Sequence, residues 1–177
     1  MIRDAEQADS QQICDIYNHY IRHSSATFEE VELDVAQIAA RISQLQQHYV
    51  WLVFERDEKI LGYAYAGQWK PRSAYRFAAE CSIYLAKDAA GKGVGKALYS
   101  QLIDLLEDYP IATLIGGIAL PNPASIALHE RLGFHKVAEF ERIGRKFGRW
   151  VNVGYWQRQI KTEQQIEALE QRVAEES

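Results

Sequence analysis

The stretch from Lys87 to Glu107, KDAAGKGVGKALYSQLIDLLE, holds three glycines within five residues, directly before an apolar pattern with helical spacing. Glycine has no Cβ, so an anion can approach the main-chain N–H groups of such a loop closely. The helix that follows adds the positive end of its dipole. Lys92 and Lys96 bring further positive charge to the same place. These residues indicate a site for a phosphate-like group; the alternative is a glycine-rich turn without a ligand.

Two common nucleotide-binding patterns do not fit this loop. Gly91, Gly93 and Gly95 give G-x-G-x-G, whereas a dinucleotide fingerprint needs G-x-G-x-x-G. A P-loop needs G-x-x-x-x-G-K-[ST], but Ala90 stands at the first glycine position and Ala97 replaces the hydroxyl that binds Mg²⁺. We therefore expect anion binding through main-chain amides and no nucleotide hydrolysis.

The loop needs a strand before it and a helix after it, and the sequence predicts both. Strands that are joined first by a hairpin and then by helices indicate a mixed α/β sheet with helices on both faces. The expected strands cover residues 1–5, 49–55, 60–69, 75–86, 111–119, 135–143 and 150–160, and the expected helices cover 9–23, a segment that Asp34 caps, 93–107 and a segment that ends at Gly133.

Composition narrows the class of protein. A chain of 177 residues with 47% hydrophobic residues suits one domain with a sizeable core. The net charge of -4, without a basic block, argues against nucleic acid as a partner, and the longest apolar run is far short of a membrane span. Cys14 and Cys81 make neither a disulfide framework nor a zinc site. We expect two free thiols in a cytoplasmic protein, with no metal.

Two motifs resemble the GNAT acyltransferase superfamily. AGKGVGKAL, after the strand ECSIYL, is similar to the acetyl-CoA pyrophosphate loop Q/R-x-x-G-x-G/A, with Gly93 and Gly95 at the glycine positions. Ala90 departs from the pattern, because it stands where a Gln or Arg can contact the pyrophosphate. LPNPASIALHERLGF resembles the second signature, with Asn122 before the helix and His129 where many relatives carry tyrosine.

Six segments in order narrow the resemblance to the phosphinothricin N-acetyltransferase branch: CDIYNHYI, ATFEE, GYAYAGQWKPRSAY, AECSIYL, IALHERLGF and KFGRWVNVGYWQR. The resemblance implies the GNAT acyl-CoA N-acyltransferase fold, a mixed central sheet of about seven strands with helices on both faces. It assigns residues 1–160 to a GNAT acetyltransferase domain and leaves 161–177 as a charged C-terminal tail, helical or frayed. Such relatives are homodimers that use acetyl-CoA to acetylate the α-amino group of small amino acids such as phosphinothricin and methionine sulfoximine.

Acetyl transfer requires a base for the ammonium group and, in turn, a proton for the departing thiolate. Glu80 lies in an otherwise apolar strand, where burial would raise the pKa of its carboxyl toward the range useful for a base. The resemblance implies this role for Glu80; a strand glutamate that faces solvent is the alternative. His129 matches the position of a general acid, and its alternatives are a role as base and a purely structural role.

The resemblance also implies two sets of binding residues. The cofactor-binding set comes from the glycine loop and from a strand that splays away from its neighbour. It is expected to contact the cofactor largely through the main chain. Arg72 is expected to clamp a substrate carboxylate, with a solvated loop cation as the alternative. Lys146 and Trp150 are expected to reach the partner's site. The cofactor set is Ile83, Tyr84, Leu85, Gly91, Lys92, Gly93, Val94, Gly95, Lys96, Asn122 and Ser125, and the substrate set is Phe28, Glu29, Arg72, Tyr75, Lys146 and Trp150.

The sequence leaves three functions open. The first is direct N-acetyltransfer from acetyl-CoA to a small amino acid, with Glu80 as the base. The second is a non-catalytic GNAT module that binds acyl-CoA, which the change at Ala90 keeps open. The third is acetylation of another small amine. Acetylation of protein chains is disfavoured, because a carboxylate clamp at Arg72 works against chain substrates.

Overall fold

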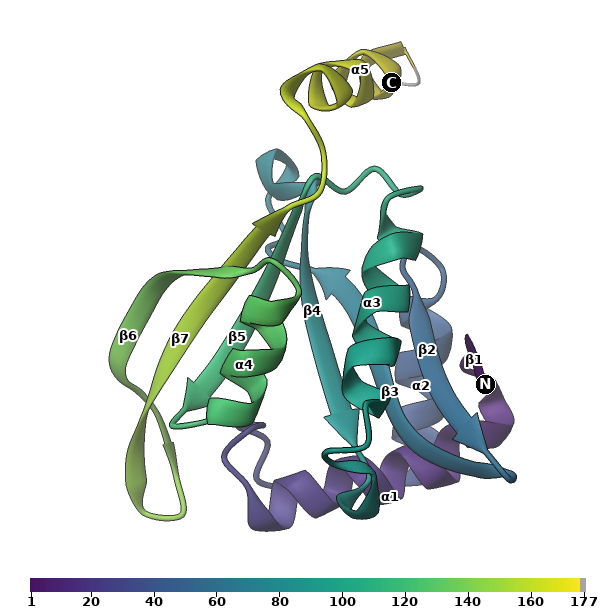
Figure 1. Ribbon diagram of the computed structural model, residues 1–177, viewed down its shortest axis with the longest axis vertical. Coiled ribbons are helices and arrows are strands. Elements are labelled where there is room, and N and C mark those ends of the chain that lie inside the picture. The colour runs from purple at the N-terminus through teal and green to yellow at the C-terminus, as the bar shows by residue number, and fades with distance from the viewer. Residues whose placement is uncertain (176–177) are drawn as a thin grey trace.

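The computed structural model describes residues 1–175, with side chains up to Arg172, and shows one sheet with helices on both faces (Figure 1). The predicted mixed α/β sheet is confirmed, and the expected strands and helices are present. The strands are β1 (Ile2–Asp4), β2 (Trp51–Arg56), β3 (Lys59–Gln68), β4 (Ala78–Leu85), β5 (Thr113–Leu120), β6 (His135–Lys146) and β7 (Arg149–Gln159), and the helices are α1 (Ser10–His23), α2 (Val35–Leu45), α3 (Val94–Leu106), α4 (Pro123–Arg131) and α5 (Glu163–Glu175).

Local signals fix most of the boundaries. Asp34 caps α2, because its carboxylate accepts the Gln37 N–H at 2.8 Å while the Gln37 side chain accepts the Asp34 N–H at 2.9 Å. Gly133 follows α4 with a φ of 82°, as a glycine after a helix end does. Several strand ends differ from the prediction by one to three residues. β4 begins at Ala78 instead of Tyr75, because Ser73–Tyr75 forms a 3₁₀ turn instead of strand.

The seven strands are ordered β1-β2-β3-β4-β5-β7-β6. Only β4 and β5 run parallel, while the other neighbours are antiparallel. The parallel pair is joined by α3, and parallel strands need such a crossover. β4 and β5 are therefore the two central strands between an N-terminal and a C-terminal group of antiparallel strands.

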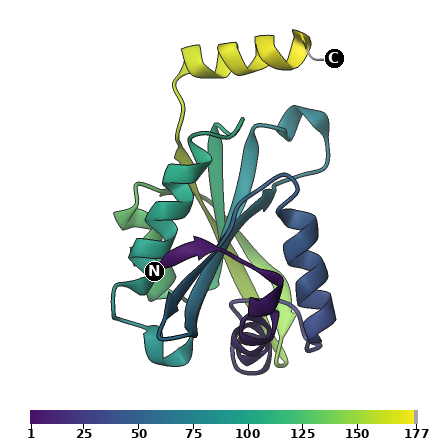
Figure 2. The same cartoon turned by 90° about the vertical axis from the view of Figure 1, so that its right-hand side faces the viewer.

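Two hydrophobic cores hold the helices on the sheet. In Figure 2 the sheet stands between α3 and α4 on one side and α1 and α2 on the other. Leu98 and Leu102 of α3 pack with Trp156 of β7 in one core. Ile13 of α1 and Ile42 of α2 pack against strands β2 and β3 in the other. The two cores fix α1, α2, α3 and α4 relative to the central strands.

The central strands pair over only part of their length. β4 and β5 are aligned at three positions, from Ala78 opposite Thr113 to Glu80 opposite Ile115, and no pairing follows. β4 continues to Leu85 along β3, while β5 continues to Leu120 along β7. The two strands therefore diverge beyond Glu80, as the resemblance to GNAT proteins implied.

The C-terminal helix α5 stands above the end of the sheet (Figures 1 and 2). Its Leu169 side chain is buried, and polar side-chain contacts also join this region to the body. The Lys161 ammonium donates to the Glu107 carbonyl at 2.8 Å, and Glu170 lies 3.7 Å from the Arg76 guanidinium. Residues 176 and 177 of the expected tail lie outside the described residues.

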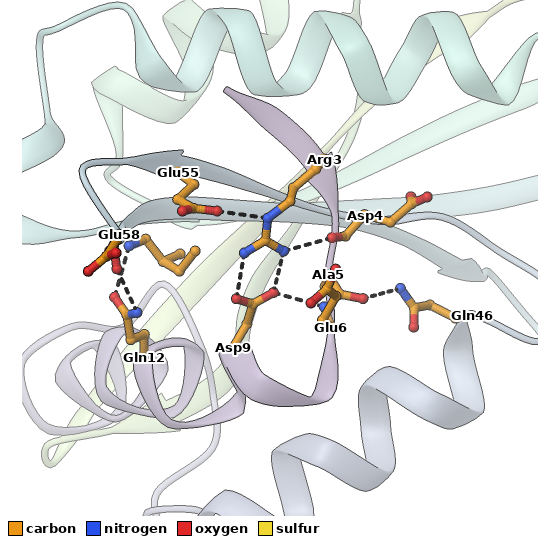
Figure 3. Close-up of polar contacts among 10 residues, drawn as sticks. Arg3, Asp4, Ala5, Glu6, Asp9, Gln12, Gln46, Glu55 and Glu58 are labelled. Atoms are coloured by element: carbon orange, nitrogen blue, oxygen red, sulfur yellow. Dashed lines mark hydrogen bonds and ion pairs between the residues drawn. The ribbon is translucent and has the colours of Figure 1, made fainter.

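A buried ion-pair cluster ties β1 to the beginning of α1 and to β2 (Figure 3). The Arg3 guanidinium donates to both carboxylate oxygens of Asp9, at 2.7 and 2.8 Å, and to Glu55 at 2.8 Å. Asp9 also accepts the Glu6 N–H at 2.8 Å. This bidentate geometry fixes the first strand at the edge of the sheet.

Candidate active site

The divergence of β4 and β5 opens a cleft of about 270 Å³ through the sheet. Its walls come from both strands, from α4, and from Tyr20 and Ala26 beside the other face. Of the predicted cofactor residues it is lined by Ile83, Tyr84, Leu85, Asn122 and Ser125, together with His129. The cleft begins one residue beyond Glu80, where the pairing of the central strands stops.

The main chain of β4 offers hydrogen-bonding groups to this cleft. Because alternate residues of a strand direct their N–H and C=O groups to opposite sides, Cys81 and Ile83 face the gap, while Tyr84 faces its partner in β3. Leu85 faces the gap too, but its N–H and C=O are both bonded to the Tyr20 hydroxyl, at 3.3 and 3.0 Å. Leu85 is thus left to contact a ligand through its side chain, and the Cys81 carbonyl is a candidate main-chain contact that the sequence analysis missed.

The glycine loop continues from the end of the cleft, where Ala90 is part of the lining. Gly91 and Gly93 have φ of 75° and 78°, a region that side chains rarely adopt. Gly93 is the N-cap of α3, so N–H groups without helical partners follow it. Lys92 and Lys96 are exposed beside them. The loop therefore has the geometry and charge of an anion site.

Two residues of this loop have structural roles as well. The Val94 side chain is buried with Leu61, so only its main chain is available to a ligand. Gly95 lies inside the first turn of α3, and a Cβ there would come within 3.2 Å of the Leu85 side chain. Gly95 thus allows α3 to pack closely against β4, a role that leaves its predicted main-chain contact possible.

Glu80 lies on the face of the sheet that carries α1 and α2. Burial raises the pKa of its carboxyl above the ordinary value, an effect that the charge of Lys70 partly offsets. The carboxylate extends over Gly117 of β5: a Cβ on Gly117 would stand 3.2 Å from its Oε1 and 3.3 Å from the Tyr155 ring. A half-buried carboxylate with a raised pKa, beside the point where the sheet opens, is suited to accept a proton.

His129 is almost completely buried, with 3% of its surface exposed. Its Nδ1 donates to the Ser125 carbonyl at 2.8 Å, and its Nε2 lies 3.0 Å from the Tyr99 hydroxyl. Burial lowers the pKa of the imidazole, although the Ser125 carbonyl acts in the opposite direction. The neutral ring therefore carries its hydrogen on Nδ1 and accepts from Tyr99. Its place in the cleft lining is as predicted, but both nitrogens already have partners.

Asn122 and Ser125 shape the other wall of the cleft. The Asn122 side-chain oxygen caps α4 by accepting the Ser125 N–H at 3.1 Å. Its amide nitrogen has no such role in the cap and is available to a ligand. Ser125 in turn places its carbonyl against His129.

The predicted substrate residues come from two loops. Arg72 and Tyr75 stand on the exposed turn between β3 and β4, directly before the strand that carries Glu80. Phe28 and Glu29 belong to the loop between α1 and α2. Phe28 packs on Gly144 of β6, where a Cβ would come within 2.2 Å of the ring, and Glu29 pairs with Arg41 at 2.8 Å.

Of the two residues expected to reach a partner's site, Lys146 is bound within its own chain, whereas Trp150 is exposed. Lys146 is buried and donates to the carbonyls of Ser24 and Thr27 of its own chain, at 2.7 and 2.8 Å. It therefore holds the loop that carries Phe28. Trp150 is half exposed on the β6–β7 hairpin, and the Arg142 guanidinium stands 5.3 Å from its ring.

Comparison with known proteins identifies the family. The model of the acetyltransferase (GNAT) domain matches residues 2–153. Phosphinothricin N-acetyltransferase of Alcaligenes faecalis is 42% identical over 90% of this chain and 82% of its own length. The L-methionine sulfoximine/L-methionine sulfone acetyltransferase of Salmonella typhimurium is 36% identical over 90% of this chain and 94% of its own.

A solved structure agrees with these relatives. A GNAT superfamily phosphinothricin acetyltransferase from Sinorhizobium meliloti, in complex with acetyl-CoA, superposes with a TM-score of 0.87 at 38% identity, over 90% of this chain and 87% of that one. The chain belongs to the GNAT acetyltransferase family. The family resemblance, the fold and acetyl-CoA as co-substrate, all expected from the sequence, are thereby confirmed.

The structure fits acetyl-CoA on its own geometry. The positive-φ glycines form a cradle with no side chain in it, since nothing lies within 4 Å of a Cβ built at Gly91 or Gly93. The Cys81 carbonyl and the main-chain groups of Ile83 lie in the gap that follows, beyond the last β4–β5 pair. For this GNAT acetyltransferase, Ala90 removes one possible side-chain contact and leaves the main-chain cradle unchanged.

Three residues around Glu80 escaped the sequence analysis: Gly117, Tyr155 and Trp69. The Trp69 and Tyr155 rings meet edge to face at 5.4 Å. Their position depends on the strand order β4-β5-β7, which no local motif reports. The signal that could have drawn attention to them is the glycine pair in IATLIGGIA, because glycines inside a strand mark a close approach.

Residues 1–175 contain neither a cluster of metal ligands nor a membrane-spanning helix. No three His, Cys, Asp or Glu side chains gather there as a metal ion would need. None of the helices in that range has the length and apolar character to span a bilayer.

Proposed function

We propose that this GNAT acetyltransferase moves an acetyl group from acetyl-CoA to the α-amino group of a small amino acid or analogue, with Glu80 as the general base. The observation that carries the proposal is the position of Glu80. Its half-buried carboxyl has a raised pKa and lies at the last paired position before the central strands diverge. The activities of the relatives from Alcaligenes faecalis and Salmonella typhimurium support an amino-acid acceptor.

The reaction has a simple balance. When bound, acetyl-CoA supplies a thioester: a C–N bond forms to the amine, the C–S bond breaks, and the thiolate leaves. Glu80 accepts the proton that the ammonium group must lose, directly or through water. The main-chain N–H of Ile83 in β4 polarises the carbonyl oxygen. The departing thiolate takes its proton from water, because both nitrogens of the neutral His129 ring are already bonded, one to the Ser125 carbonyl and one to the Tyr99 hydroxyl.

Residues of the cleft and the loop would hold the cofactor. The N–H groups from Gly91 to Lys96, with the two lysine side chains, would bind the diphosphate. Ile83 would pair with the pantetheine arm as an added strand does, and Leu85 would pack against it. Asn122 would donate its side-chain amide to the same arm, and Ser125 borders it.

Acceptor recognition needs a cation for the carboxylate and a wall for the rest of the molecule. Arg72, with Tyr75 beside it, is the proposed carboxylate clamp, because both stand exposed on the turn that leads to Glu80. Phe28 and Glu29 form the opposite wall, on the loop that Lys146 holds in place.

We further propose a homodimer through the β6–β7 hairpin, in the cytoplasm. β6 is an edge strand with unpaired main-chain groups on one side. Five large apolar side chains of the hairpin are 48 to 60% exposed: Val137, Phe140, Ile143, Phe147 and Trp150. A patch of this kind marks a protein interface. Trp150 would then contact the second chain. The buried free thiols of Cys14 and Cys81 suit a reducing compartment.

The direct test is release of coenzyme A thiol when the protein is incubated with acetyl-CoA and phosphinothricin, methionine sulfoximine or methionine sulfone. We expect release above the rate without acceptor, and a product whose acetyl group is on the α-amino nitrogen by mass spectrometry. Tight binding of acetyl-CoA without release for these acceptors or the twenty amino acids would instead support a non-catalytic module.

A further inference from the structure

A second cavity, of about 380 Å³, lies between α2 and strands β2 and β3. Its volume falls in the range of small-molecule sites, about 300–1,000 Å³. Trp51, Tyr63 and Tyr65 form an aromatic floor, in which the Trp51 and Tyr65 rings stack with centroids 4.5 Å apart. Leu45 of α2 closes it from above. It shares no lining residue with the cofactor cleft.

The register of the sheet places this cavity beside Glu80. Gly67, which lines the cavity, is the cross-strand partner of Glu80, so both lie on the same face. Tyr65, also in the lining, is paired with Ser82 next along β4. A Cβ at Gly67 would have only the Leu45 side chain within 4 Å, at 3.6 Å, so there is room for ligand atoms over this residue.

The rim of the cavity is polar. Arg41 stands at the rim, and one N–H of its guanidinium is paired with Glu29 at 2.8 Å. The other N–H groups of a guanidinium can still donate to an occupant. Gln44, His48 and Gln68 add further polar groups. A chain that is apolar along the aromatic floor and accepts hydrogen bonds at its end suits these walls.

We propose that this cavity receives the side chain of the amino-acid acceptor, an unbranched or aromatic chain of about the length of methionine whose polar end meets Arg41 at the rim. The inference rests on the proposed function, because it is the α-amino group at Glu80 that directs the side chain over Gly67. The acceptor side chain would pass over Gly67 to enter the cavity, and the Leu45 side chain would limit the depth of the cavity.

Two opposite substitutions test the cavity. Gly67→Val fills the passage, so the ratio of kcat/KM for methionine sulfone to that for alanine should fall about 10-fold or more, as expected when one or two methyl groups obstruct a pocket. Leu45→Ala deepens the cavity, so the ratio for phenylalanine to methionine sulfone should rise several-fold. Should Gly67→Val fail to fold, Gly67→Ala replaces it, because its Cβ meets Leu45 at an ordinary contact distance.

Leu105→Ala is the matched control, since Leu105 packs against the core on the opposite face of the sheet. It should lower the melting temperature and leave both ratios unchanged. Ratios that stay within about 2-fold of wild type in both cavity variants, in protein that acetylates amino acids, would overturn the cavity assignment alone. Wild-type protein that binds acetyl-CoA and acetylates no amino acid would overturn the proposed function, and this inference with it.

Discussion

At the scale of single residues, the fold changes the proton affinity of two ordinary side chains, Glu80 and His129. Glu80 is a glutamate whose pKa is raised by burial, and nothing in the side chain itself distinguishes it from the other glutamates. His129 shows the reverse effect, because burial lowers its pKa and keeps the ring neutral against Tyr99. The two groups lie on opposite faces of the sheet, and the gap between β4 and β5 connects those faces.

The ion-pair cluster at Arg3 yields a residue-scale prediction about stability. Arg3→Met keeps the aliphatic stem but leaves the buried Asp9 carboxylate without its cation. We expect the free energy of unfolding at pH 7 to fall by about 2 kcal/mol, the typical size for hydrogen bonds to charged groups. Urea denaturation measures it. Arg22→Met is the control: its ion pair with Glu32 is exposed, and the loss should stay below about 1 kcal/mol.

The same cluster predicts a pH dependence. Burial alone would raise the pKa of Asp9, but the hydrogen bonds from Arg3 and the Glu6 N–H outweigh it and hold this pKa below its ordinary value. A carboxyl with a depressed folded-state pKa stabilises the fold fully above its unfolded pKa of about 3.9 and loses that contribution as the pH falls through the folded value. The gap between wild type and Arg3→Met should therefore narrow in acid. A gap that stays constant down to the lowest pH at which both fold would contradict this.

At the scale of elements, the two faces of β5 contact different residues: the buried His129 on one face and Glu80, the proposed base, on the other. Gly116 faces α4, where a Cβ would come within 2.4 Å of His129 Nε2. Gly117, the next residue, faces Glu80 and Tyr155 on the other side. The two glycines let the buried His129 imidazole and the Glu80 carboxylate, the proposed base, approach the same strand from opposite faces.

This arrangement predicts two different outcomes for neighbouring substitutions. Gly116→Ala should destabilise the fold by about 1–3 kcal/mol, because the ring it meets is packed on every side. In Gly117→Ala the new methyl group meets the Glu80 and Tyr155 side chains, which can move. The melting temperature of this variant should therefore change little. Displacing the Glu80 carboxylate should instead lower kcat/KM about 10-fold or more. Thermal unfolding and steady-state kinetics on both variants distinguish these effects, and identical behaviour of the two would contradict the assignment of faces.

The elements themselves were largely readable from the sequence, because periodicity, the Asp34 cap and the glycine after α4 are local signals. The glycine loop was readable too, since its chemistry lies within a few residues. Two features were not. The 3₁₀ turn at Ser73–Tyr75 looked like strand, and the pairing of Lys146 with the α1–α2 loop joins segments more than a hundred residues apart. Contacts of that kind depend on strand order, which no single segment encodes.

At the scale of the whole molecule, the β6–β7 hairpin has an apolar surface that a monomer leaves exposed. If the hairpin is the proposed dimer interface, Phe140→Glu should introduce a buried charge there and shift the solution mass from two chains to one. Light scattering after size-exclusion chromatography measures it. Val31→Glu is the matched control, because Val31 is an exposed apolar residue on the α1–α2 loop. A wild-type protein with the mass of one chain would contradict the interface.

The central claim is that Glu80, beside the gap between β4 and β5, takes the proton of the acceptor amine, and the pH dependence of kcat/KM tests it most directly. In wild type the rate should fall in acid as Glu80 becomes protonated, with a midpoint above the ordinary glutamate pKa of about 4.3. Glu80→Gln should lower the rate at neutral pH about 10²-fold and abolish that acid limb. A variant that keeps the wild-type rate and the same acid limb would contradict the account.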